Sequence, residues 1–232
     1  MPSSQFKIID RKQKELLVLL PGWAGDYRIF SRLELSYNYA VPDPFWPQDA
    51  AEILPDFLRA HTQQPVRLLG LSLGGFVGAY LAAQQPDFFS HVVLVGVRQQ
   101  YPARDIAMVK FMISRSKEAF LRQFFQQCVS ATSLAREWFL PLAEAYCREG
   151  VPETLVETLV FLEQLRLTPE IVRAIPRCLF VHGAEDRIAP LSEVESLCRE
   201  VPAARLVTIK AEGHLPLTHP DFSAEVAAWL RR

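Results

Sequence analysis

The residues Leu68-Leu69-Gly70-Leu71-Ser72-Leu73-Gly74-Gly75 decide how this chain is interpreted. An apolar run, 66–71, precedes the serine, and a small-residue run with helical periodicity, 76–83, follows it. The spacing G-x-S-x-G is typical of the sharp strand-to-helix turn called a nucleophile elbow. Small residues are required at positions 70 and 74 because a Cβ there would crowd the neighbouring strand or helix. The alternative is a tight turn with an idle serine.

Composition places the chain among ordinary globular proteins. It has 232 residues, of which 50% are hydrophobic, and a net charge of −1. One domain with a large core is therefore expected, and neither disorder nor nucleic-acid binding is indicated. The apolar run 15–20 is too short to span a membrane, so neither a membrane partner nor a secretory signal is expected. Scattered cysteines without a C-x-x-C pair favour reduced thiols in the cytoplasm; they are Cys128, Cys147, Cys178 and Cys198.

Apolar strand patterns alternate with helical patterns over most of the chain. This alternation predicts an α/β fold with a mostly parallel sheet covered by helices on both faces. Strands are expected at 7–9, 16–20, 38–41, 66–71, 91–95, 178–182 and 205–209. Helices are expected at 49–61, with Asp49 as the cap, and at 76–83, 191–200 and 222–230.

The alternation stops between the fifth and sixth predicted strands. Residues 98–175 show only helical patterns, broken at 102, 141, 150–152 and 168–169. We interpret this segment as a helical lid inserted in a core formed by residues 1–97 and 176–232. Its place in the chain predicts that it covers the strand ends. Its aromatic residues are expected mainly to pack the helices, with Phe124 or Phe125 lining an acyl pocket.

Charge is distributed unevenly along the predicted lid. Residues 98–136 hold seven basic and two acidic residues, a balance of +5, whereas 137–175 hold three basic and seven acidic residues, a balance of −4. Such a split is compatible with solvated helix faces alone. It is also compatible with a docking patch for an acidic partner or an anionic substrate on the first half of the lid.

Two further residues complete a catalytic constellation with Ser72. A serine hydroxyl becomes nucleophilic when a histidine takes its proton, and the histidine needs an acid that fixes its tautomer. In the elbow fold the chain order is serine, acid, histidine. Asp186 follows the strand 178–182, and His214 follows the strand 205–209, so both come at strand ends in this order. We therefore predict Ser72, Asp186 and His214 as a triad for two-step acyl transfer.

Other residues compete for these roles. Glu185 is adjacent to Asp186, but the register of the loop favours Asp186. His219, beside a proline, is expected to cap or pack the last helix, and His182 to be a structural histidine. No metal-ligand spacing, dinucleotide fingerprint or P-loop is present in the sequence, so no cofactor and no metal are expected.

The loop Pro21-Gly22-Trp23-Ala24-Gly25 follows the strand 16–20 directly. Sites in parallel sheets form at the carboxyl ends of strands. The backbone N–H of Trp23 is thus a candidate oxyanion donor beside that of Leu73. A plain turn with Trp23 in the core is the alternative.

Together, the motif at 70–75, the Pro-Gly-Trp loop, Gly183-Ala184-Glu185-Asp186 and Gly213-His214 resemble the α/β-hydrolase superfamily over essentially the whole chain. Within it the chain is most similar to BioH-type carboxylesterases, the pimeloyl-[acyl-carrier protein] methyl ester esterases of biotin synthesis. The run 120–125 and the tail 213–220 add to this resemblance, whereas Pro21 replaces the histidine usual before Gly-Trp.

The resemblance implies a serine carboxylesterase acting on a short acyl methyl ester. Trp23 and Leu73 would form the oxyanion hole, and Trp23 and Phe124 would contact the substrate. An acyl-carrier protein would dock on the lid, and the enzyme would be a cytoplasmic monomer. Two alternatives remain open at this point: a hydrolase or lyase of another small ester, thioester, lactone or menaquinone precursor, and a non-catalytic binding protein with a hydrolase-like fold.

Overall fold

The computed structural model describes residues 3–231; the outermost residues of the predicted core, 1–2 and 232, lie outside the described residues. Seven strands form one sheet in the order β1-β3-β2-β4-β5-β6-β7. All neighbours pair in parallel except β1, which is antiparallel to β3. The predicted α/β fold is confirmed. The strands are β1 (Phe6–Ile9), β2 (Leu16–Leu20), β3 (Asn38–Pro42), β4 (Val66–Leu71), β5 (Phe89–Val95), β6 (Cys178–Gly183) and β7 (Arg205–Ile209).

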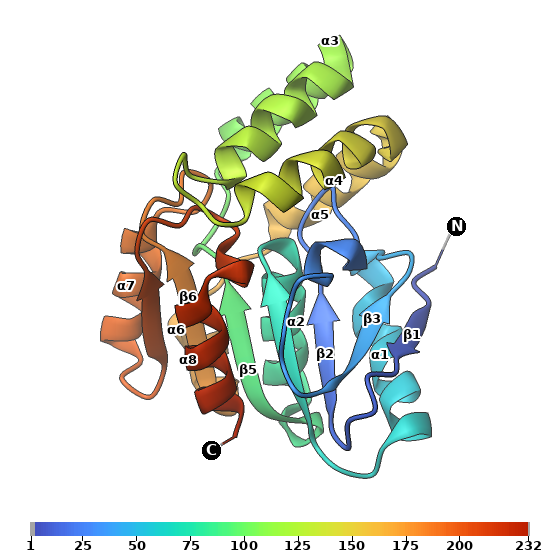
Figure 1. Cartoon of the computed structure of the whole chain (residues 1–232), viewed down its shortest axis with the longest axis vertical. Coiled ribbons are helices and arrows are strands. Elements are labelled where there is room, and N and C mark those ends of the chain that lie inside the picture. Colours follow the sequence, from blue (N-terminus) through green and yellow to red (C-terminus); the bar gives the residue numbers. More distant parts are fainter. Residues whose placement is uncertain (1–2, 232) are drawn as a thin grey trace.

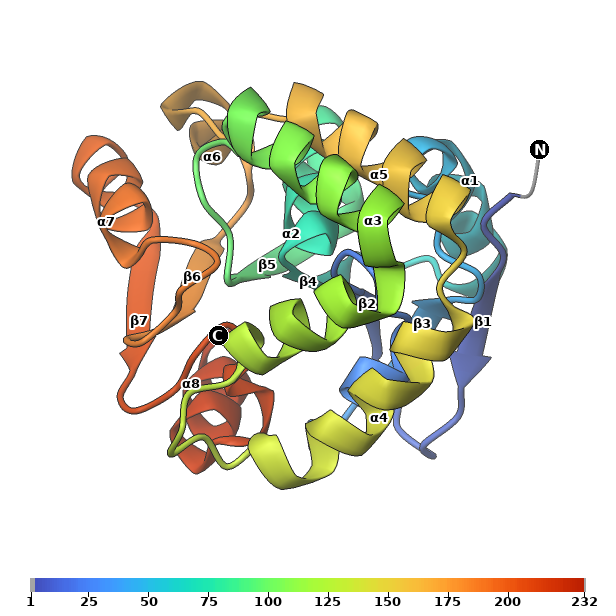
Figure 2. The ribbon, with the colours of Figure 1, turned by 90° about the horizontal axis from the view of Figure 1, so that it is seen from above.

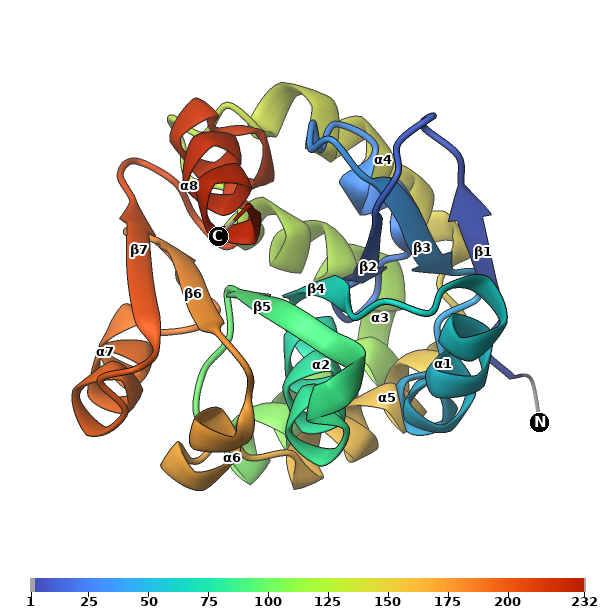
Figure 3. The ribbon, with the colours of Figure 1, turned by 90° about the horizontal axis from the view of Figure 1, so that it is seen from below.

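Helices cover both faces of this sheet (Figures 2 and 3). Helices α1 (Pro47–His61) and α2 (Leu73–Gln84) lie on one face, and α8 (Pro220–Leu230) lies on the other. Helix α7 (Leu191–Glu200) packs beside β6 and β7. Short 3-10 turns, η1 (Tyr27–Phe30), η2 (Pro86–Phe88) and η3 (Pro216–Thr218), complete the core.

The central strands are buried on both sides over most of their length, which explains their mainly apolar sequences. In β2 and β4, the side chains of Leu17, Leu20 and Leu68 are 0% exposed. Helix α2 can approach the sheet closely because Gly78 faces Leu68; a Cβ at position 78 would lie 2.5 Å from a leucine methyl group. This close contact between α2 and β4 holds the turn at Ser72, which connects the two elements.

Four helices separate β5 from β6 in the chain: α3 (Ala103–Cys128), α4 (Arg136–Glu149), α5 (Pro152–Gln164) and α6 (Pro169–Ala174). Helices α3, α4 and α5 lie above the carboxyl ends of the strands (Figure 1). Helix α3 is kinked at Ser116, whose φ of −164° and ψ of 93° are not helical. We refer to residues 98–175 as the lid.

Some local predictions are wrong. Asp49 does not cap α1: the helix begins two residues earlier, at Pro47, and the Asp49 carboxylate instead accepts the N–H of Ser4 at 3.1 Å. Helix α4 continues through Pro141, losing one backbone hydrogen bond without ending. The helical structure of the lid is instead interrupted between α3 and α4, at residues 129–135. Phe111, expected to pack helices, is 57% exposed.

Within residues 3–231, no helix combines the length and the apolar character needed to cross a membrane.

Candidate active site

Ser72 occupies a strained backbone conformation between β4 and α2. Its φ of 52° and ψ of −114° lie outside the regions that non-glycine residues favour. The turn is fixed on both sides, since the Ser72 N–H donates to Val95 O at 2.8 Å and the Ser72 carbonyl accepts from the N–H groups of Gly75 and Phe76. A strained backbone conformation persists only where the surrounding structure holds it in place, and these hydrogen bonds hold Ser72.

The two motif glycines make this turn possible. A Cβ at Gly70 would lie 2.4 Å from the carbonyl oxygen of Gly74, and a Cβ at Gly74 would lie 2.2 Å from that of Leu20. Both distances are far inside van der Waals contact, so any larger residue would displace the elbow from β2 or from the helix. The sequence motif therefore has a direct steric cause.

Asp186 and His214 meet at the same end of the sheet. The Nδ1 of His214 lies 2.8 Å from Oδ2 of Asp186, and both side chains are almost fully buried. Asp186 is held in turn by the N–H groups of Ile188 and Ala189, which donate to its Oδ1 at 2.8 and 2.9 Å. An ionised carboxylate only accepts hydrogen bonds, so Nδ1 carries the proton and Nε2 is left as a base.

Electrostatics keep Asp186 ionised. Burial by itself raises the pKa of a carboxyl group, but here the interaction and hydrogen bond with His214 and the N–H of Ala189 outweigh it, so the pKa of Asp186 is lowered. A carboxylate in this state holds the tautomer of His214 and stabilises an imidazolium when it forms.

The competing residues occupy other positions. Glu185 is exposed. His219 caps α8, as predicted, and accepts the N–H of Asp221 at 3.2 Å. His182 is 1% exposed and donates from Nε2 to Ala189 O at 2.7 Å, with Asp186 at 3.3 Å. Burial lowers the pKa of His182, which suits a neutral supporting histidine.

The loop 21–25 lies against the elbow, as an oxyanion site requires. An added Cβ at Gly22 would be only 3.5 Å from Cβ of Ser72. In the described part of the chain, neither the Trp23 N–H nor the Leu73 N–H donates a backbone hydrogen bond. The Trp23 indole is tied to the lid, because its Nε1 donates to Leu155 O at 3.1 Å. Two free N–H groups beside Ser72 are thereby available to a ligand oxygen.

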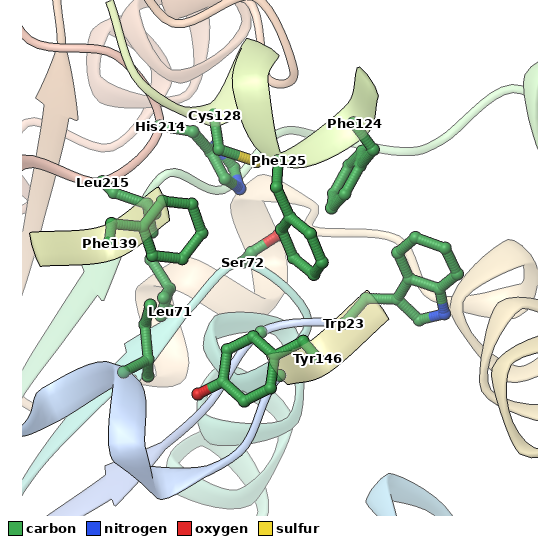
Figure 4. A pocket seen from close by; sticks show the side chains of 13 residues that line it. Trp23, Leu71, Ser72, Phe124, Phe125, Cys128, Phe139, Tyr146, His214 and Leu215 are labelled. Atoms are coloured by element: carbon green, nitrogen blue, oxygen red, sulfur yellow. The ribbon is translucent and has the colours of Figure 1, made fainter. Parts of the chain in front are cut away.

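Ser72 and His214 line a common apolar cavity of about 40 Å³ beneath the lid (Figure 4). Phe124 lines it too, with its ring edge-on to Trp23 at 5.1 Å between centroids. A second cavity of about 300 Å³ adjoins the first across Trp23 and is lined also by Leu73 and Arg28. The remaining residues of the first cavity are Gly22, Gly25, Ile29, Leu71, Phe125, Cys128, Phe139, Tyr146 and Leu215.

Sequence reasoning missed several residues at or near this cavity. Burial raises the pKa of the Tyr101 phenol to about 12, against the opposing influence of Ser72 and Arg98, so the phenol stays protonated. Cys128 lines the cavity as a neutral thiol, since burial raises its pKa well above the ordinary value. Gly96 has a φ of 57° and lies against the His214 ring: a Cβ added at this position would be 2.9 Å from the ring atoms. Only Gly96 had a usable signal: a glycine directly after a predicted strand.

We expect acid to remove a stabilising contribution of Asp186. Its pKa in the folded protein is below the ordinary 3.8, so the ionised carboxylate stabilises the fold above that pH. The contribution is lost as the pH falls through the lowered folded pKa. Urea unfolding of the wild type and of Asp186→Asn, between about pH 3 and about pH 7, measures it.

The difference in unfolding free energy between these two proteins should be constant in the upper part of this range and shrink toward its acid end. An equal difference at both ends would contradict the lowered pKa. Asp26→Asn, which removes a carboxylate from the neighbouring cavity, is the control for general loss of charge.

Comparison with known proteins identifies the family of this fold. The model of the Alpha/beta hydrolase family matches residues 16–226. Pimeloyl-[acyl-carrier protein] methyl ester esterases are similar: that of Chromobacterium violaceum is 26% identical, covering 92% of this chain and 93% of its own, and that of Nitrosomonas europaea is 29% identical, covering 88% and 91%.

Solved structures share the fold. The enol-lactonase from Burkholderia xenovorans LB400 superposes with a TM-score of 0.85 at 17% identity, covering 99% of this chain and 96% of its own. The esterase from Exiguobacterium antarcticum gives a TM-score of 0.83 at 15% identity, with the same coverage. At such identities the likeness concerns the fold alone.

This chain belongs to the alpha/beta hydrolase family. The prediction of an enzyme of the carboxylic ester hydrolase class is confirmed by this family and by its esterase-named relatives.

Proposed function

We propose that this protein is a serine carboxylesterase that hydrolyses the methyl ester of a short acyl chain, pimeloyl-acyl-carrier-protein methyl ester in biotin biosynthesis. The observation that carries the proposal is that Ser72 and His214 line one apolar cavity, while the other side of the His214 ring is bonded to Asp186. The similarity to pimeloyl-[acyl-carrier protein] methyl ester esterases supports the choice of substrate.

Catalysis proceeds in two acyl-transfer steps. The Nε2 of His214 takes the proton of the Ser72 hydroxyl, and the serine oxygen attacks the ester carbonyl. The N–H groups of Leu73 and Trp23 donate to the oxyanion, each contributing roughly 3 kcal/mol to lowering the barrier. His214 then protonates the departing alcohol. Water, activated by the same nitrogen, releases the acid and restores Ser72.

The cavities fit a substrate with an apolar chain. Aromatic side chains, including Phe124 and Phe125, line the space at Ser72, and apolar burial there favours a hydrocarbon over a charged group. Phe124 and Trp23 are the residues we assign to acyl contact. The larger cavity, with Arg28 paired to Asp26 and Glu149 at its wall, gives a longer chain room to continue.

The first half of α3 carries a face suited to an acidic partner. Met108 and Phe111 are 60% and 57% exposed, and Arg104 and Arg115 lie one turn to either side of them on the same face. Exposed apolar residues between two cations favour a partner that is acidic and partly apolar. We assign acyl-carrier-protein docking to this face of the monomer.

The four cysteines are all free, which supports a reducing, cytoplasmic location.

Two substrates test the proposal. The wild type should hydrolyse p-nitrophenyl butyrate as well as monomethyl pimelate bound to a carrier protein, and should rescue a biotin-requiring strain that lacks its esterase. Charge reversal of Arg104 and Arg115 to Glu should lower kcat/KM for the carrier-bound ester about tenfold, because encounter with an acidic carrier is electrostatically steered. Hydrolysis of the free ester should not change.

The matched control is Arg199→Glu, an exposed charge on α7. Ester hydrolysis without rescue would refute the role in biotin synthesis and favour another small ester, thioester or lactone. Absence of any hydrolysis would favour the binding-protein alternative.

A further inference from the structure

A buried carboxylate outside the predicted triad lies two residues before His214. Glu212 is 1% exposed, and no ion pair within residues 3–231 reaches it. Its oxygens accept hydrogen bonds from the Ser133 hydroxyl and from the Leu134 N–H, the latter at 3.1 Å. A buried polar group is costly unless it is hydrogen-bonded, and both groups that bond the Glu212 side chain come from the lid.

The lid segment 129–135, between α3 and α4, covers the whole loop 211–213. The carbonyl of Ala211 accepts from the hydroxyls of Ser130 at 2.6 Å and Thr132 at 3.3 Å. Gly213 lies so close to the lid that an added Cβ would be 2.8 Å from Cys128 O. Ala211 has a φ of 57°, which a non-glycine residue adopts only when its neighbours hold it there.

The same loop contacts the segment that carries Asp186. The carbonyl of Glu212 accepts the N–H of Glu185 at 2.9 Å. An added Cβ at Gly183 would lie 1.9 Å from Gly213 O. The loop is thus enclosed between the lid and the end of β6, and the His214 ring that follows it is bounded by Gly96.

We infer that Glu212 is a positioning residue for His214: its carboxylate fastens the lid segment 129–135 to the loop 211–213 and so sets the place of the imidazole. The inference rests on the proposed function, in which His214 is the base. It adds that the lid supports the catalytic geometry through a buried hydrogen-bonded connection, besides covering the substrate. A base that is displaced by about 1 Å loses about 10²-fold in rate.

Three variants test this: Glu212→Ala, Glu212→Gln and Ser133→Ala. The readouts are kcat and KM on p-nitrophenyl butyrate and the rate at which a fluorophosphonate probe labels Ser72, each corrected for the folded fraction measured by urea unfolding. Glu212→Ala should lower kcat and the labelling rate about 10²-fold with KM within about threefold, since the base alone is misplaced. Glu212→Gln should recover most of the rate, because its amide oxygen still accepts the Leu134 N–H.

The control is Glu185→Ala, an exposed carboxylate on the adjoining loop, which should leave both rates unchanged. A Glu212→Ala protein that is less stable but reacts at the wild-type rate per folded molecule would overturn the inference in favour of a purely structural role. If Glu212→Ala does not fold, Ser133→Ala decides: about a fivefold slower labelling supports the inference, and an unchanged rate refutes it.

A wild type that the probe does not label would instead refute the proposed function, and the inference with it. The two failures are therefore distinguishable, because one appears in the wild type and the other only in the variants.

Discussion

Replacement of Ser72 by alanine should lower the hydrolysis of p-nitrophenyl butyrate by about 10⁴-fold or more, because the acyl-enzyme can no longer form. The substitution removes only a hydroxyl group from a backbone that is fixed by the Val95, Gly75 and Phe76 hydrogen bonds. Steady-state kinetics measure the loss, and intact-mass analysis should show no adduct with a fluorophosphonate probe.

The variant should unfold at nearly the same urea concentration as the wild type, because it leaves the elbow intact. Ser4→Ala serves as a matched loss of one buried hydroxyl, since Ser4 is 3% exposed and its Oγ donates to Trp46 O, away from the elbow; it should still form the adduct. Persistence of ester hydrolysis in Ser72→Ala at more than about a hundredth of the wild-type rate would mean that another nucleophile acts, and would end the serine mechanism.

Most of the fold followed from periodicity. Strands such as β2 and β5 contain buried apolar runs, at 17–20 and 92–95, and such runs separated by helical patterns leave few arrangements other than a parallel sheet. Parallel strands place their carboxyl ends at one edge, so residues following β4, β6 and β7 were expected to meet there. The contact between Asp186 and His214 is the result.

What the sequence did not reveal depends on contacts that leave no periodic signal. In the sequence, nothing distinguishes Glu212 from an exposed loop residue. Its burial depends on the segment 129–135, whose two bonding residues, Leu134 and Ser133, are 78 and 79 residues away along the chain. Tyr101 presents the same difficulty, because its burial under the influence of Ser72 depends on the path of the connection that leads from β5 into the lid. Pairings at such separations are decided by tertiary packing.

Phe111 illustrates the converse error. Phe111 was expected, with the other aromatic residues of the lid, to pack helices, but it is 57% exposed on the part of α3 that precedes the kink at Ser116. An amphipathic pattern predicts a buried face only where a partner element is present. The exposed side chain is therefore better explained as part of the proposed docking face than as core.

His214→Gln should reduce ester hydrolysis by about 10⁴-fold while leaving the fold intact, because the amide has no basic nitrogen to accept the serine proton. The double variant Ser72→Ala/His214→Gln should be no slower than either single variant, since the two residues act as one unit and cannot be lost twice. Kinetics of the three proteins on p-nitrophenyl butyrate, with labelling rates for His214→Gln, measure this coupling.

The control lies five residues along the chain. His219→Gln removes a histidine that caps α8 and lines neither cavity at the elbow, so it should cost about 1 kcal/mol of stability at most and change activity little. If His219→Gln abolished hydrolysis and His214→Gln did not, the base would be misassigned. Multiplicative losses in the double variant would mean that Ser72 and His214 do not share one proton transfer, because independent steps contribute independently to the barrier.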